Sequence, residues 1–198
     1  MALTFDAAWG ADKTSKIIEI LQENKVDATF FLVGFWVEEN ADKVIEINNA
    51  GFDIGTHSNT HPKMSTLSSA QITEELTISS NLITQITGKA VSYFRAPFGD
   101  YNDLVLNTAT SLGLKTIQWD VDSLDWKGIS AQEILSRVKQ SVKDGSIILF
   151  HNNSDYILQA LPLVINYLKE QGYSMVKISD LVYDSDYSIN NNGLQIKN

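Results

Sequence analysis

The chain alternates short apolar segments with longer segments of helical periodicity, and this alternation limits its possible folds more than any other feature. Between the apolar segments, apolar residues recur at helical spacing, as in Ile17 and Leu21 or in Ile134 and Val138. Such alternation predicts a mainly parallel sheet, and about seven strands fit either a closed barrel or an open doubly wound sheet. Seven segments have the composition of buried strands: Ala2–Phe5, Ala28–Val33, Phe52–Gly55, Val91–Phe94, Lys115–Trp119, Ser146–Phe150 and Tyr173–Ile178.

The composition is that of one soluble globular domain. The chain has 198 residues, of which 43% are hydrophobic and 20% are charged, so it can bury a sizeable core. It has no cysteine, which excludes disulfides, thiolate nucleophiles and cysteine-based zinc sites. Its formal net charge of -9 argues against nucleic acid as a partner, because phosphate backbones are bound by basic surfaces. A neutral or cationic polymer is compatible with this charge.

We divide the chain into a domain over residues 1–182 and a polar tail over residues 183–198, which predicts a linker or a frayed end. No segment resembles a signal peptide or a membrane span. Met1 nevertheless runs almost directly into the apolar segment Ala2–Phe5, whereas chain ends are usually peripheral. We therefore expect an export signal or membrane anchor ahead of this segment in the full-length protein, and a location outside the cell or at the cell wall. We also expect a monomer whose domain makes no membrane contact itself.

Ionisable side chains follow several of the expected strands at the point where each strand ends. Asp6, Arg95 and His151 come directly after apolar runs, where an uncompensated charge is costly. In parallel α/β folds the C-terminal ends of the strands carry the chemistry. The full set contains all three histidines of the chain: Asp6, His57, His61, Arg95, Asp122, Asp125 and His151.

Two of these histidines, His57 and His61, are four residues apart. On a helical turn, or on a tight loop that resembles one, this spacing puts both imidazoles on one side, as two ligands of a zinc-type ion require. The alternative is a pair of unrelated polar loop histidines, because such pairs also arise by chance.

Three further residues each have a catalytic and a structural interpretation. Asp6 is either a general base beside the metal or the N-cap of the helix that begins a few residues later. Arg95 either pairs with Asp6 and keeps its carboxylate ionised, or tethers a loop by hydrogen bonds. His151 is either a general acid held by Asp125 or a core histidine with satisfied hydrogen bonds.

Five segments in order resemble the motifs of the polysaccharide deacetylases with a NodB-type homology domain, carbohydrate esterase family four. They are Thr4-Phe5-Asp6, His57-Ser58-Asn59-Thr60-His61, Arg95-Ala96-Pro97-Phe98, Asp122-Ser123-Leu124-Asp125-Trp126 and Leu149-Phe150-His151. One such motif is weak, but five in order are highly specific. The resemblance runs from the first strand to about Ile178 and implies an α/β fold, a distorted (β/α) barrel of about seven parallel strands.

The resemblance also implies a role for each motif residue. Asp6 is similar to the family's catalytic base and Arg95 to the residue that orients it, while His151 is similar to the general acid that Asp125 orients. The remaining roles are metal binding by His57 and His61, an apolar slot for the acetyl methyl at Trp126 and Leu149, and oxyanion binding by the N–H of Phe98.

One metal ligand of the family is missing from this sequence. The family usually has a second aspartate directly after the first, and this chain has Ala7 there. The run from Thr4 to Gly10 resembles a clostridial-type subgroup with the same departure. We expect a divalent metal, zinc or alternatively cobalt, that is bound weakly because only two neutral imidazoles hold it.

The function that the resemblance implies is hydrolytic removal of N-acetyl groups from an amino-sugar polysaccharide such as peptidoglycan or chitin. One alternative is a non-catalytic glycan-binding member of the same fold. Another is an esterase that removes O-acetyl groups from a xylan-like polymer. An amine leaves less easily than an alcohol, so an N-deacetylase has the greater need of a general acid at His151.

Overall fold

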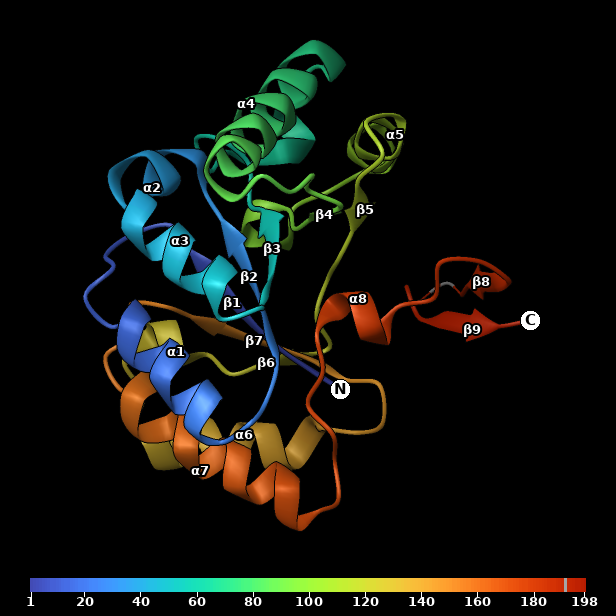
Figure 1. Ribbon diagram of the computed structural model, residues 1–198. Helices are drawn as coiled ribbons and strands as arrows, with labels where there is room; N and C mark the ends of the chain where they lie inside the picture. The colour runs from blue at the N-terminus through green and yellow to red at the C-terminus, as the bar shows by residue number, and fades with distance from the viewer. Residues whose placement is uncertain (191) are drawn as a thin grey trace.

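A computed structural model describes residues 1–190 and 192–198, and a seven-stranded parallel sheet forms its centre (Figure 1). The strand order is β5-β4-β3-β2-β1-β7-β6, so β5 and β6 are the two edges. The sheet curls into a half-barrel, which confirms the predicted barrel-like α/β fold and its number of strands. The strands are β1 (Ala2–Ala7), β2 (Ala28–Leu32), β3 (Asp53–Thr56), β4 (Tyr93–Phe94), β5 (Lys115–Thr116), β6 (Val121–Asp122) and β7 (Ile147–His151).

Helices cover the sheet, with α1, α6 and α7 gathered on one side of the molecule and α4 and α5 on the other (Figure 1). The predicted capping box at the start of α6 is present, because the Ser130 hydroxyl accepts from the Glu133 N–H while the Glu133 carboxylate accepts from the Ser130 N–H. The helices are α1 (Thr14–Glu23), α2 (Gly34–Glu39), α3 (Ala41–Asn49), α4 (Ser69–Thr87), α5 (Asp103–Ser111), α6 (Ala131–Ser141), α7 (Ile157–Glu170) and α8 (Ile178–Leu181). No helix in the described part of the chain is long and apolar enough to span a membrane.

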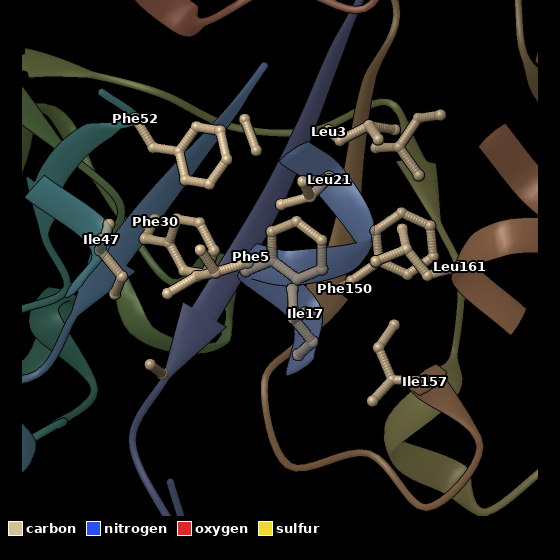
Figure 2. Packing of buried hydrophobic residues seen from close by; sticks show 14 of the residues in the cluster. Leu3, Phe5, Ile17, Leu21, Phe30, Ile47, Phe52, Phe150, Ile157 and Leu161 are labelled. Carbon is tan, nitrogen blue, oxygen red and sulfur yellow. The ribbon is translucent and has the colours of Figure 1, made fainter. Parts of the chain in front are cut away.

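The core is centred on β1, whose six residues are all buried. The Phe5 ring stacks on Phe30 of β2 and on Phe150 of β7, with ring centroids 5.0 and 5.6 Å apart (Figure 2). A central strand of a parallel sheet is covered on both faces, which explains its nearly continuous apolar sequence. The same packing holds the C-terminal ends of β1 and β7 in fixed register, and the candidate site lies at those ends.

Two predicted elements at the C-terminal end of the chain are wrong. The segment Tyr173–Ile178 is not a strand, because it makes only isolated hydrogen bonds beside β1 and β2, such as Val176 N–H to Met1 C=O at 2.9 Å. The seventh strand is instead β6, which the sequence hides because it has only two residues and ends in Asp122. The predicted linker or frayed tail contains an antiparallel hairpin, β8 (Tyr187–Ile189) with β9 (Gln195–Lys197).

The hairpin has a local cause in its turn. The side chain of Asn190 accepts hydrogen bonds from the N–H groups of Asn192 and Leu194, and Gly193 has a φ of 76°. Asparagine and glycine are the residues that such turns require. The polar residues that led us to predict a frayed end therefore include those that form the turn of a hairpin.

Candidate active site

The sheet brings four of the predicted site residues together at its C-terminal edge. Asp6, the penultimate residue of β1, lies beside His151 at the end of β7, and the two residues are direct partners in the register of the parallel pair. His57 follows the last residue of β3, and Arg95 follows the last residue of β4. Parallel strands end at the same edge, so residues 145 positions apart in sequence become neighbours in space.

Asp6 and Arg95 form a buried ion pair. The Arg95 Nη1 donates to Asp6 Oδ1 at 2.9 Å and to the Thr4 hydroxyl at 2.8 Å, and its guanidinium lies over the ring of Phe31. The predicted pairing is confirmed in geometry. The alternative of Asp6 as an N-cap is wrong, because Lys13 occupies the N-cap position of α1.

The ionised state of Asp6 depends on its neighbours. Burial by itself raises the pKa of Asp6, but His57, Arg95 and His151 outweigh burial and keep that pKa below its ordinary value. Burial also lowers the pKa of His57, so that ring is neutral near pH 7. The guanidinium of Arg95 is therefore the cation that keeps the buried carboxylate charged.

His151 and Asp125 form a second pair. Asp125 is fully buried and accepts two hydrogen bonds from His151, at 2.8 Å from Nδ1 and at 2.8 Å from the backbone N–H. Burial lowers the pKa of His151, but the hydrogen bond and charge of Asp125 outweigh it and raise that pKa above its ordinary value. The Nδ1 hydrogen bond leaves Nε2 as the nitrogen that can exchange a proton with a ligand.

The two histidines of the predicted pair lie side by side, although no helix carries them. The His57 and His61 ring centroids are 5.0 Å apart, and His61 also lies edge-on to Trp9 and Phe98 at 5.0 and 4.6 Å. The Nδ1 of His57 is bound to the carbonyl of Arg95 at 2.8 Å, and its Nε2 lies 3.4 Å from Asp6 Oδ2. Burial and the neighbouring His57 lower the pKa of His61 to about 4, so this ring is also neutral near pH 7.

Backbone strain is concentrated around these side chains. Among residues 1–190 and 192–198, six non-glycine residues have positive φ, and four of them belong to the loops of the site: Ser58, His61, Phe98 and Leu124. Each such conformation costs about 1–3 kcal/mol and persists only where the surrounding structure enforces it. The loops of the site are thus held in conformations that their own residues do not favour.

The side chains present do not fit the three-ligand metal site of a catalytic zinc enzyme. Ala7 is completely buried directly after Asp6, at the position where the family has its second aspartate. Among the described residues, no three His, Cys, Asp or Glu side chains are grouped so that they could hold a metal ion. A catalytic zinc ion normally has three protein ligands and one open position. The predicted ligands of this chain, His57 and His61, are only two.

The three residues predicted to contact substrate differ in exposure. Phe98 and Trp126 are 64% and 57% exposed, so their rings are available to a ligand, whereas Leu149 is almost fully buried in β7. Phe98 lies in a tight turn with a φ of 60°. Trp9, at 58% exposure, extends the aromatic surface on the other side of His61.

Sequence reasoning assigned no role to several residues that support the site. Thr4 accepts from Arg95, and its signal was available, because residues two apart on a strand point to the same face and Thr4 is two residues before Asp6. Asn152 donates its backbone N–H to the carbonyl of Asp6 and its side chain to the carbonyl of Gly10. Glu75 of α4 binds the loop between the two histidines. Nothing in the local sequence marks Asn152 or Glu75.

Known proteins with similar sequences identify the family of this chain. A family model for polysaccharide deacetylase matches residues 1–117. The peptidoglycan-N-acetylmuramic acid deacetylase PdaA of Bacillus subtilis is 32% identical over 189 residues, covering 93% of this chain and 72% of that protein. The uncharacterized protein YlxY of the same species is 32% identical over 182 residues, covering 92% of this chain and 57% of that protein.

The similar solved structures belong to the same family, and one of them is described as a pseudoenzyme. A CE4 family pseudoenzyme from Bacillus anthracis has 38% identity and a TM-score of 0.89, covering 93% of this chain and 66% of that chain. A mutant of that protein with restored enzymatic activity has 40% identity and a TM-score of 0.88, covering 91% of this chain and 66% of that chain. This chain therefore spans less than two thirds of the length of YlxY and of the pseudoenzyme. The chain belongs to the polysaccharide deacetylase family, carbohydrate esterase family four, with its NodB-type domain.

Proposed function

We propose that this chain acts on an N-acetylated amino-sugar polysaccharide of the peptidoglycan or chitin type, and that its site is built for hydrolysis of the acetamide. In this proposal Asp6 accepts the proton of the attacking water and His151 donates a proton to the departing amine. Arg95 and Asp125 orient these two groups. The N–H of Phe98 is the proposed donor to the oxyanion.

The observation that carries the proposal is the pairing of Asp6 and His151 across neighbouring strands. Their environments move the two pKa values in opposite directions, because Arg95 stabilises the carboxylate while Asp125 stabilises the imidazolium. Two titratable neighbours whose pKa values are separated in this way can work as base and acid. Amide hydrolysis requires both, since an amine must be protonated to leave.

Three exposed aromatic rings support a glycan as the ligand. Trp9, Phe98 and Trp126 each expose more than half of their surface beside the site. Aromatic rings present an apolar face with a fixed shape, which suits the apolar face of a sugar ring. Two relatives are named as peptidoglycan deacetylases. We therefore propose a cell-wall polymer as the ligand and a location outside the cell or at the cell wall.

A second candidate function is glycan binding without turnover. It is favoured by Ala7 and the two-imidazole metal site, and by the likeness to a family member described as a pseudoenzyme. Under this candidate the aromatic rings and the two charged pairs still bind the polymer. Under this candidate, hydrolysis is lost because the third metal ligand, the aspartate that the family has at position 7, is absent.

Acetate release separates the two candidates. We would incubate the natural chain, Ala7→Asp and His151→Ala with N-acetylated chitooligosaccharide and with peptidoglycan, in the presence of zinc or cobalt. The deacetylase proposal expects acetate from the natural chain, more from Ala7→Asp, and a loss of about a hundredfold or more in His151→Ala.

Other outcomes redirect the proposal. Sugar binding without acetate under any metal would sink the hydrolytic proposal and support the binding protein. If turnover appears only in Ala7→Asp, the third ligand alone is the limiting defect. Acetate from O-acetylated xylan alone would identify an esterase.

A further inference from the structure

The loop that carries both histidines is anchored on one side by α2. The N–H groups of Gly34 and Phe35 donate to the carbonyls of Ser58 and Asn59, at 3.0 and 3.3 Å. The contact is close, because a Cβ built on Gly34 would lie 2.0 Å from the Asn59 side chain. On this side of the loop, the backbone N–H groups at the start of α2 therefore bind the backbone carbonyls of the loop.

On the other side, the loop closes on itself where the His61 N–H donates to the Ser58 hydroxyl at 3.0 Å, and a carboxylate from α4 binds the two residues in between. The carboxylate of Glu75, on α4, accepts from the N–H groups of Asn59 and Thr60 at 2.8 Å each, and from the Thr60 hydroxyl at 2.6 Å. Hydrogen bonds to an ionised acceptor are about twice as strong as neutral ones. Glu75 thus makes three strong bonds to the two residues that immediately precede His61 and its proline neighbour.

The next turn of α4 supports the same loop. Ser79, four residues after Glu75 and on the same face of the helix, shares a hydrogen bond with the Thr56 hydroxyl at 2.5 Å. That hydroxyl accepts the N–H of Ser58 at 3.2 Å. One face of α4 therefore braces the loop at both of its ends.

The loop needs such support because its backbone is strained. Ser58 and His61 have φ angles of 69° and 60°, in the left-handed region that non-glycine residues disfavour. His57 has an independent anchor in the Arg95 carbonyl, 2.8 Å from its Nδ1. For His61 the side-chain neighbours are ring edges of Trp9, His57 and Phe98, which do not fix a direction as hydrogen bonds do.

We propose that Glu75 is a positioning residue of the site, which holds residues 59 and 60 and thereby places the His61 ring between Trp9 and Phe98 beside His57. It contacts no substrate itself. Its positional role is independent of the proposed function, and the catalytic consequence described below rests on that function. The role is local, since the bonds of Glu75 go to one loop.

The test compares Glu75→Ala and Glu75→Gln with Glu74→Ala and Glu74→Gln, because Glu74 is the adjacent, exposed carboxylate of the same helix. The chain has three histidines, so imidazole proton and carbon signals can be followed one by one in NMR spectra after assignment with His61→Asn. Amide hydrogen exchange of residues 59 and 60, and thermal unfolding, are measured on the same samples.

In Glu75→Ala we expect the His61 ring signals to lose the ring-current shifts of Trp9 and Phe98 and move toward free-histidine values. The signals of His151 should stay in place, and those of His57 should change only through the ring current of the adjacent His61. Exchange of the two amides should accelerate about tenfold or more, as the loss of hydrogen bonds to a charged acceptor requires. Glu75→Gln keeps an amide oxygen as acceptor, so it should fall between the natural chain and Glu75→Ala.

Two results would overturn the proposal. In one, His61 signals in both Glu75 variants match those of the Glu74 controls. In the other, all three histidines shift together with a lowered melting temperature, which identifies a general structural role. If Glu75→Ala does not fold, Glu75→Gln decides between these outcomes.

The catalytic consequence is tested separately in the Ala7→Asp background. There Glu75→Ala should lower kcat for acetate release about tenfold to a hundredfold, because small displacements of site groups have effects of that size, while Glu74→Ala leaves kcat unchanged. A displaced His61 together with unchanged kcat in that background would remove the catalytic part of the proposal. Absence of acetate in the parent Ala7→Asp protein would count against the proposed function and leave the NMR result to decide the role of Glu75.

Discussion

The two halves of the site differ in how completely their groups are paired. The acid–base half, formed by Asp6, Arg95, Asp125 and His151, has two ion pairs in which each group has a partner of opposite charge. The histidine loop, residues 57–61, has two imidazoles that burial keeps neutral, held by backbone contacts and aromatic edges. The comparison teaches that both ion pairs form although position 7 is alanine, and that the two halves meet at His57, whose Nδ1 is bound to the Arg95 carbonyl.

The largest expected effect is in the acid–base half. Arg95→Met leaves the Asp6 carboxylate buried without a cation, and should lower the free energy of unfolding by about 3–5 kcal/mol. Urea unfolding measures this. Arg137→Met is the matched control, because Arg137 is the only other arginine and is exposed, and its effect should stay within about 0.5 kcal/mol. A cost below about 1 kcal/mol for Arg95→Met would mean that Asp6 is not held by this pair.

The next effect tests the histidine loop. Ala7→Asp places an unpaired carboxylate at a fully buried position, so the metal-free protein should lose about 1–3 kcal/mol of stability. Added zinc should recover this loss through preferential binding to the folded state, and should stabilise the natural chain less. Ala8→Asp, which changes a neighbouring residue in the same way, should show no zinc-specific recovery. Equal zinc effects on the natural chain and Ala7→Asp would contradict the view that position 7 limits metal binding.

A smaller effect is expected at the second ion pair. Asp125→Asn keeps the shape of the side chain but removes the charge that holds His151, and should cost about 1.5 kcal/mol in urea unfolding. The His151 imidazole signals should shift in the same variant while those of His57 stay in place. A variant with natural stability and an unshifted His151 signal would show that Asp125 does not orient this ring.

The smallest effect is a dependence on pH. Because the pKa of folded His151 is raised by Asp125, the stability from this pair is fully present below the unfolded pKa of about 6.5 and is lost as pH rises through the folded pKa. The difference in unfolding free energy between the natural chain and Asp125→Asn should therefore shrink as pH rises across this range. Parallel stability curves for the two proteins would contradict the raised pKa.

Prediction from the sequence succeeded where the site residues themselves formed an unusual local pattern. Asp6, Arg95 and His151 could be chosen because each places charge directly after an apolar strand. Their geometry agrees with the predicted pairing. The motif resemblance resolved the choice between a closed barrel and an open sheet in favour of a barrel-like fold, and the half-barrel bears this out.

Prediction from the sequence failed where the composition of a segment was compatible with more than one structure. The segment Tyr173–Ile178 has a strand-like composition but lies beside β1 without a ladder, whereas the short strand β6 has almost no apolar signal. The tail was expected to be a linker or frayed, yet the turn around Asn190 and Gly193 supports a hairpin. In each case tertiary hydrogen bonds or turn chemistry outweighed composition.

Six of the seven sheet strands, the charged strand ends and the alanine at position 7 can be read directly from the printed chain, because each depends on residues close together in sequence. The tertiary structure alone decided that Asp6 lies beside His151, that Arg95 bridges Thr4 and Asp6, and that Glu75 holds the loop before His61. These contacts join residues that sequence separates by up to 145 positions. They exist because parallel strands end at one edge, where packing of the core fixes their register.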